Sequence, residues 1–252
     1  MVKMQSRQDG TKLAYELISS PSATFNVMFL GGFRSDMMGS KAEMLAHHAA
    51  ELGYHFLRFD YRGHGQSQGN FAEYGIADWL DDAMEMYKIL PSLPTILIGS
   101  SMGGYLALLM ARQHLDHLCG LIGIAAAPDF TERLMWPKLS PSQQQDIMNN
   151  GGVAIPTPYD DEPYWISQTL IEQGRDLLIL DQPKHLGVPT HLIQGGCDED
   201  VPPNWPEKIR SSILDKDVVI TMICDGDHRL SRDSDLFILR QSLLHIRYKA
   251  GL

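Results

Sequence analysis

The chain has 252 residues, a length that α/β folds often fill as one domain with a large core. Its hydrophobic content of 44% and its charged content of 21% are ordinary for a globular protein. The formal net charge of -10 repels nucleic acid and anionic membranes, which excludes both from the expected partners.

Targeting signals are not expected in this sequence. The N-terminal stretch has neither the apolar core of a secretory signal nor the Arg- and Ser-rich character of a transit peptide. No apolar run reaches the length of a membrane span. The three cysteines, Cys119, Cys197 and Cys224, form no CxxC pair and lack zinc-ligand spacing, which fits a reducing compartment. We therefore expect a cytoplasmic protein without a membrane span.

Strand and helix patterns alternate along the first half of the chain. Asp9 and Gly10 separate two short strand-like runs, 2–7 and 12–18, and predict a hairpin. Further strands are expected over residues 25–30, 55–59, 95–98 and 119–127, and helices over 40–52, 76–90 and 105–112. This alternation predicts an α/β fold with a mostly parallel central sheet and helices on both faces. In such sheets, ligands bind beyond the carboxyl ends of the strands.

The helix expected over 40–52 has recognisable signals at both ends. Ser40 is the expected N-cap, and Glu43 stands at the capping-box position. Gly53 is the expected C-cap, because a glycine there adopts the left-handed conformation without strain.

The regular pattern breaks at Asp129, and residues 129–186 follow a different composition. This 129–186 segment carries scattered prolines and two weak helical patterns, over 142–149 and 164–175. Its bulky apolar side chains are Met135, Trp136, Tyr159 and Trp165. Because such side chains need a surface to pack on, we expect a small cap inserted over the strand ends, rather than a connection that only decorates the surface.

The core pattern then resumes within the same domain, which is expected to span residues 1–252. Strands are expected over 189–194 and 217–223, and helices over 204–214 and 233–248.

The candidate nucleophile lies in residues 95–112, where a β-branched strand, a Gly-rich turn and an apolar helix follow one another. This is the context of a nucleophile elbow, Gly-x-Ser-x-Gly. Ser101 has Gly99 and Gly103 at the two flanking positions, whereas the flanks of Ser100 are bulky. Ser101 is therefore the nucleophile candidate.

A serine hydroxyl needs an adjacent base, and histidine is suited to taking and returning its proton. Among the ten histidines, His228 follows a predicted strand late in the chain. This agrees with the chain order Ser…Asp…His that accompanies a nucleophile elbow. His64 also lies in a loop after a strand, but it precedes the serine, and Gly63 and Gly65 beside it suit a structural turn.

The third residue must orient the imidazole and stabilise its charged form. Asp198 follows the strand expected over 189–194 and is the preferred candidate. Asp200 is close enough to be an alternative. Asp129 is a topologically distinct alternative, although it also fits an N-cap of the first helix in the 129–186 segment.

The tetrahedral oxyanion of an acyl transfer needs two fixed N–H donors. One is expected from the backbone of Met102, directly after the nucleophile, and the other from the backbone of Phe33, in the loop after the strand expected over 25–30. Arg34 stands beside Phe33. We hypothesise that it meets a substrate carboxylate, and the alternative is an ion pair with Asp36 or another acid.

The local strings resemble one branch of the α/β-hydrolase-fold serine hydrolases. FLGGFRSDMMGSKA (29–42), RFDYRGHGQSQGNF (58–71), IGSSMGG (98–104) and GDHR (226–229) are similar to the branch that holds the mitochondrial acyl-protein thioesterase and acyl-glucuronide esterase, and its bacterial relatives. The likeness covers nearly the whole chain. One departure is Gly31, where many superfamily members carry a histidine. The lack of a transit peptide is a second, so mitochondrial location does not carry over.

The resemblance implies Ser101, Asp198 and His228 as a triad, Phe33 and Met102 as oxyanion donors, and acyl esters or thioesters as substrates. No metal or organic cofactor is required by this chemistry. The expected partner is a small-molecule or acylated substrate. A peptidase, lactonase or C–C hydrolase on the same fold, or a binding member without turnover, are the alternatives, because a triad alone does not separate these functions.

Overall fold

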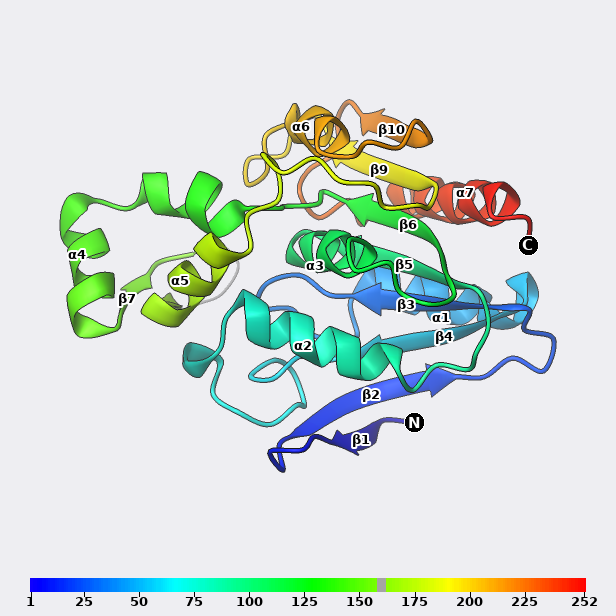
Figure 1. Ribbon diagram of the computed structural model, residues 1–252, viewed down its shortest axis with the longest axis horizontal. Coiled ribbons are helices and arrows are strands. Elements are labelled where there is room, and N and C mark those ends of the chain that lie inside the picture. Colours follow the sequence, from blue (N-terminus) through cyan, green and yellow to red (C-terminus); the bar gives the residue numbers. More distant parts are fainter. Residues whose placement is uncertain (158–161) are drawn as a thin grey trace.

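The computed structural model describes residues 1–157 and 162–252. Its centre is an eight-stranded sheet in the order β1-β2-β4-β3-β5-β6-β9-β10 (Figure 1). The pairs β1–β2 and β2–β4 are antiparallel, and every other pair in this sheet is parallel. The strands are β1 (Lys3–Ser6), β2 (Lys12–Ile18), β3 (Phe25–Leu30), β4 (Tyr54–Phe59), β5 (Thr95–Ser100), β6 (Leu118–Ile124), β9 (Thr190–Gly195) and β10 (Val218–Ile223). The expected mostly parallel sheet is confirmed.

Helices cover both faces of this sheet because alternate strand residues point to opposite sides. On one face, Val27 and Phe29 pack with α1 (Ser40–Leu52) and α7 (Asp233–Lys249). On the other, Met28 and Leu30 pack with helices that include α2 (Ile76–Tyr87), α3 (Met102–Ala111) and α6 (Trp205–Ser211). Strand β3 is buried along its whole length, as its continuous apolar sequence predicts.

The ends of α1 agree with the prediction at one terminus only. Gly53 is the C-cap, with φ 72° and its N–H donating to the carbonyl of Ala49. The expected capping box is wrong, since Gly39 is the N-cap and no side chain caps it. Glu43 instead pairs its carboxylate with the guanidinium of Arg58 on β4. A charged partner in the tertiary structure therefore outcompetes the local backbone bond.

The 129–186 segment leaves the sheet after β6 and returns at β9. Figure 1 shows α4, β7 and α5 of this segment beyond the carboxyl ends of the parallel strands. Its elements are two short helical turns, η2 (Thr131–Met135) and η3 (Trp136–Lys138), then α4 (Pro141–Asn150), β7 (Gly152–Ile155), β8 (Tyr164–Ser167) and α5 (Gln168–Asp176). The predicted helix over 164–175 is wrong in its first turn, because residues 164–167 pair antiparallel with β7. Tyr159 lies outside the described residues.

Asp129 joins the beginning and the end of this segment. Its carboxylate is fully buried, and it accepts the backbone N–H groups of Ile179 at 2.8 Å and Leu180 at 3.1 Å. The same group pairs with Arg133 at 3.0 Å. The expected N-cap role is wrong, since Phe130 is the N-cap of η2 and no side chain caps it. Asp129 instead fastens the segment's exit to its entry. Within the described ranges, no helix combines the length and the apolar character needed to cross a bilayer.

Candidate active site

Ser101 lies at the sharp turn between β5 and α3. Its backbone has φ 54° and ψ −117°, a conformation that an L residue adopts only under strain. The backbone around it compensates for that strain. The N–H of Ser101 donates to the carbonyl of Ile124 at 2.8 Å, and its own carbonyl accepts from the N–H of Ala127 at 3.1 Å. These bonds fix the turn against β6.

The glycines that flank Ser101 are required by close backbone contacts. A Cβ at Gly99 would lie 2.2 Å from the carbonyl oxygen of Gly103. A Cβ at Gly103 would lie 2.0 Å from the carbonyl oxygen of Leu30. Both distances are far below van der Waals contact, so neither position tolerates a side chain. This is the physical reason why the Gly-x-Ser-x-Gly pattern selects Ser101.

His228 reaches Ser101 from the loop that follows β10. Its Nε2 lies 3.0 Å from the Oγ of Ser101, and its Nδ1 lies 2.9 Å from the Oδ2 of Asp198. A carboxylate only accepts hydrogen bonds, so the proton of the neutral imidazole resides on Nδ1. Nε2 is then left as an acceptor facing the serine hydroxyl, which is the arrangement that a general base needs.

Asp198 is held in the loop after β9 by donors on both of its oxygens. Its side chain has no exposed surface. Oδ1 accepts the backbone N–H groups of Asp200 at 2.9 Å and Val201 at 2.8 Å, and Oδ2 accepts the amide of Gln194 at 2.8 Å. Burial alone would raise the pKa of this carboxyl. The hydrogen bond and charge of His228 and the two backbone donors outweigh burial and lower the pKa, so the group stays anionic.

Of the two alternative acids, Asp129 binds Ile179 and Leu180 outside this network. Asp200 supports Asp198 through its backbone N–H. Asp198, Asp200 and His228 also bring possible metal-ligand atoms within 4.8 Å of one another. Both oxygens of Asp198 and both ring nitrogens of His228 already have hydrogen-bond partners, so the geometry fits a proton network rather than a cation site.

The loop after β3 passes directly beside Ser101. A Cβ built on Gly32 would lie 3.6 Å from the Cβ of Ser101. Among the hydrogen bonds of the described residues, none uses the backbone N–H of Phe33 or Met102 as a donor. Both groups therefore remain available to a ligand atom beside Ser101.

The side chain of Phe33 lies in an aromatic cluster beside this loop. Its ring centroid lies 5.0 Å from that of Phe71 and 5.9 Å from that of Tyr164 on β8, both edge to face. The guanidinium of Arg34 lies over the same two rings, 4.8 Å from the centroid of Phe71 and 5.3 Å from that of Tyr164. Arg34 therefore stands where the 129–186 segment meets the loop after β3.

His64 is not part of the Ser101 network. Its ring is buried, and its Nε2 accepts the backbone N–H of Arg34 at 3.2 Å. Its position between Gly63 and Gly65 predicts a structural turn, whereas its observed contact is with a loop thirty residues earlier. Gln194, which orients Asp198, was also missed. A polar residue at the end of a buried strand was the only signal for it.

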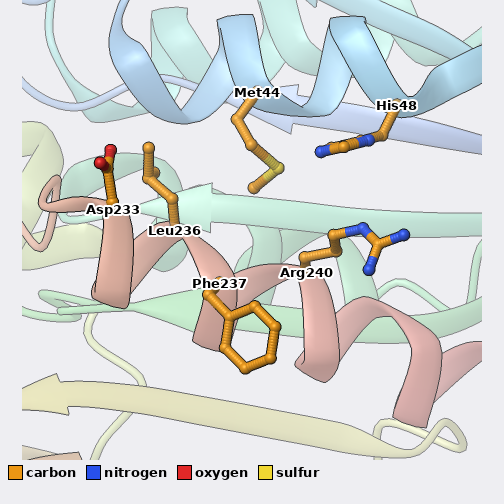
Figure 2. A pocket seen from close by; sticks show the side chains of 6 residues that line it. All are labelled: Met44, His48, Asp233, Leu236, Phe237 and Arg240. Atoms are coloured by element: carbon orange, nitrogen blue, oxygen red, sulfur yellow. The ribbon is translucent and has the colours of Figure 1, made fainter.

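A surface hollow elsewhere on the molecule contains none of the predicted site residues. It lies between α1 and α7 and is lined by Met44, His48, Asp233, Leu236, Phe237 and Arg240 (Figure 2). It lies on the face of the sheet that α1 and α7 cover, whereas the candidate residues lie at the carboxyl ends of the strands.

The eight-stranded, mostly parallel sheet with helices on both faces is the fold of the α/β hydrolases, and Ser101, His228 and Asp198 come together at the carboxyl ends of its strands. Residues 23–235 match the family described as serine aminopeptidase, S33, and the chain belongs to that family. The palmitoyl-protein thioesterase ABHD10, mitochondrial, of Mus musculus is 32% identical over 235 residues, which cover 93% of this chain and 78% of the mouse protein.

Two solved structures have the same fold over almost their whole length. A protein of Agrobacterium vitis S4 assigned as a hydrolase superposes with a TM-score of 0.90 at 33% identity, over 98% of this chain and 99% of that one. The mouse alpha/beta hydrolase domain-containing protein 10 superposes with a TM-score of 0.88 at 29% identity, over 99% of each chain. The resemblance to the thioesterase branch is thereby confirmed, and the chain is a hydrolase acting on ester or thioester bonds.

Proposed function

We propose that this chain hydrolyses acyl esters or thioesters through a Ser-His-Asp triad and an acyl-enzyme intermediate. One observation carries the proposal. The Oγ of Ser101, both ring nitrogens of His228 and the carboxylate of Asp198 form a continuous hydrogen-bonded line, with distances of 3.0 and 2.9 Å.

In the acylation step, the Oγ of Ser101 attacks the carbonyl carbon while the Nε2 of His228 takes the hydroxyl proton. Asp198 stabilises the imidazolium that forms. The backbone N–H groups of Met102 and Phe33 donate to the oxyanion, and the N-terminus of α3 adds its partial positive charge. When the tetrahedral intermediate collapses, the ester or thioester bond breaks and His228 returns the proton to the alkoxide or thiolate.

Deacylation repeats the sequence with water as the nucleophile. His228 takes a proton from the water as its oxygen attacks the acyl carbon, and the same two N–H groups bind the second oxyanion. Collapse releases the carboxylic acid, and the proton returns to the Oγ of Ser101. Only protein groups and water take part.

We further propose that the 129–186 segment acts as a cap within a single domain of residues 1–252. Its α5 packs on α2, where the side chain of Gln173 accepts the N–H of Ala77 at 2.9 Å and donates to Asp78 at 2.8 Å. Tyr164 of β8 contacts Phe33 beside the nucleophile. These contacts support a cap whose shape decides which acyl groups and leaving groups enter.

The alternatives differ in the bond that is cleaved. The family description names an aminopeptidase, and peptidases, lactonases and C–C hydrolases use the same triad. The name of the mouse relative, a thioesterase, favours ester or thioester cleavage. A member that binds without turnover is disfavoured, because hydrogen bonds already connect the serine, the histidine and the aspartate.

Two measurements test this proposal. A fluorophosphonate probe is expected to label Ser101, and intact-protein mass spectrometry with peptide mapping identifies the site. A panel of acyl esters, acyl thioesters, lactones and aminoacyl amides then ranks kcat/KM, with esters or thioesters expected first. Absence of labelling favours the binding member, and a preference for aminoacyl amides favours the peptidase.

We propose a cytoplasmic location, in contrast with the mouse relative, which is named as mitochondrial. The three cysteines are free thiols, as a reducing compartment favours. Fractionation of source cells with antibodies against the chain would show the enzyme in the soluble cytoplasmic fraction, and its recovery with another compartment would refute the location.

A further inference from the structure

His64 lies in a closely packed aromatic site next to the proposed oxyanion loop. Only 3% of its surface is exposed. Its ring is edge-on to those of Tyr61 at 5.5 Å, Phe71 at 5.1 Å and Trp79 at 5.1 Å between centroids. Rings on three sides leave the imidazole little freedom to rotate.

Both nitrogens of this ring have backbone partners. Nε2 lies 3.2 Å from the N–H of Arg34, so it must be the unprotonated nitrogen that accepts. Nδ1 lies 3.2 Å from the carbonyl of Arg62, so it must carry the proton and donate. One neutral tautomer satisfies both bonds. Burial lowers the pKa of His64 to about 4, which keeps the ring neutral at physiological pH.

The residue that accepts from His64 is itself anchored to α2. The backbone N–H and the Nε of Arg62 each donate to the buried carboxylate of Asp82 at 2.8 Å. The carbonyl of Arg62 also accepts the indole N–H of Trp79 at 3.1 Å. His64 therefore transmits a fixed position from α2 to the loop after β3.

The loop held by His64 contains a strained residue. Arg34 has φ 59°, in the left-handed region that favours glycine. Such a conformation persists only where the surroundings hold it. The hydrogen bond from the N–H of Arg34 to His64 fixes the peptide unit that joins Phe33 and Arg34, and so restricts the ψ angle of Phe33.

We propose that His64 is a positioning residue that aims the backbone N–H of Phe33 at the oxyanion beside Ser101. The inference rests on the proposed function, because it assigns His64 a part in the oxyanion hole of that mechanism. Gly31 occupies the position at which many members of the superfamily carry a histidine. Here an imidazole from the loop after β4 reaches the loop after β3 through the N–H of Arg34.

A positioning role predicts a loss confined to the transition state. His64→Leu keeps an apolar side chain but removes the acceptor. It is expected to lower kcat about 10- to 100-fold with little change in KM, since loss of a whole oxyanion donor costs about 10²–10³-fold. His64→Gln can place its amide oxygen near the position of Nε2 and is expected to recover most of this loss. The shorter side chain of His64→Asn cannot, so it is expected to resemble His64→Leu.

The decisive readout is binding of an alkyl boronic acid, which forms a tetrahedral adduct with the serine. Its affinity is expected to fall by the same factor as kcat across the three variants, while the affinity of the carboxylic acid product stays constant. A merely structural role would not connect the boronate affinity to the presence of an acceptor. His47→Leu, an exposed position on α1, is the matched control and is expected to behave as the wild type.

Two results would overturn the inference. One is a folded His64→Leu protein with unchanged kcat and unchanged boronate affinity. If His64→Leu does not fold, the pair His64→Gln and His64→Asn decides, and equal behaviour of the two overturns it. Ser101→Ala separates this failure from failure of the mechanism. An active Ser101→Ala protein refutes the proposed function. If Ser101→Ala is inactive but the His64 variants keep the kcat and boronate affinity of the wild type, only the positioning role is refuted.

Discussion

The Nε2 of His228 lies 3.0 Å from the Oγ of Ser101, although 127 positions separate the two residues in the sequence. Ser101 follows β5 and His228 follows β10, and two strands, β6 and β9, lie between these in the sheet. Parallel strands bring their carboxyl ends to one edge, so the contact depends on the order of the whole sheet.

Replacing Ser101 with alanine is expected to lower kcat by a factor of about 10⁴–10⁶, because the proposed triad would act as a unit. Hydrolysis of a 4-nitrophenyl ester measures the loss. Ser100→Ala is the matched control, since Ser100 is the buried neighbour of Ser101 at the end of β5. Near-wild-type activity in a folded Ser101→Ala protein would refute the nucleophile.

Replacing Asp198 with asparagine is expected to lower kcat about 10³- to 10⁴-fold with an intact fold. The amide of asparagine can donate to the Nδ1 of His228, which favours the tautomer with its proton on Nε2. In that tautomer, Nε2 cannot accept the proton of the serine hydroxyl. Asp200→Asn separates the two candidate acids, because its backbone N–H still reaches Asp198. The kcat of Asp200→Asn is expected to stay within about tenfold of that of the wild type. A larger fall in kcat in Asp200→Asn than in Asp198→Asn would reverse the assignment.

Replacing Gly103 with alanine is expected to destabilise the fold by about 2–4 kcal/mol or to prevent folding. Its Cβ would lie 2.0 Å from the carbonyl oxygen of Leu30, where only backbone movement could make room. Gly39→Ala is the control, because a Cβ there meets no atom within 4 Å. Guanidinium unfolding of both proteins measures the difference, and equal stabilities would contradict the contact.

The buried His64 makes stability depend on pH. Burial lowers its pKa to about 4 in the folded state, against an ordinary value of 6.5. Between these pH values, His64 binds a proton in the unfolded chain but stays neutral in the folded chain. Its contribution to the free energy of unfolding is therefore present above pH 6.5 and is lost as the pH falls towards 4. The loss is about 3 kcal/mol.

Unfolding curves at pH 7, 6, 5 and 4 test this dependence. Between pH 7 and 4, the free energy of unfolding of His64→Leu is expected to fall by about 3 kcal/mol less than that of the wild type. The exposed His47→Leu is expected to keep the wild-type slope. Parallel curves for the wild type and His64→Leu would show that the ring is protonated equally in both states.

Arg34→Ala tests whether the guanidinium beside Phe71 and Tyr164 meets a negatively charged substrate. It is expected to raise KM for an ester that carries a carboxylate by about tenfold and to leave a neutral ester unchanged. Arg34→Lys keeps the charge, and its KM for the charged ester is expected to lie between those of the wild type and Arg34→Ala. Equal changes for both esters would assign Arg34 to loop structure alone.

Local sequence patterns predict much of this fold. The strand β3 and the helix α1 begin and end where the apolar periodicity predicts, and the Gly-x-Ser-x-Gly turn lies between β5 and α3. Each of these signals acts over a few residues, through burial on two faces or through clashes that only glycine avoids.

The parts that escaped prediction depend on partners distant in sequence. Glu43 pairs with Arg58 rather than with its own helix, and residues 164–167 become a strand because β7 lies beside them. The contact of His64 with Arg34 is likewise non-local. A single sequence records the residue types but not which of them meet, so these features needed the tertiary structure.

The strands β6 and β9 are hydrogen-bonded neighbours, with Leu121 opposite Thr190 and Ile124 opposite Ile193. The stretch between them leaves at the carboxyl end of β6 and crosses the sheet again to begin β9, and Asp129 fastens its start to Ile179 and Leu180, so the part from 130 to 178 begins and ends at adjacent points. A lineage can therefore lengthen, shorten or exchange that intervening stretch without disturbing the register of the sheet or the spacing of Ser101 and His228. Specificity can diverge rapidly among descendants while the reacting groups stay in place.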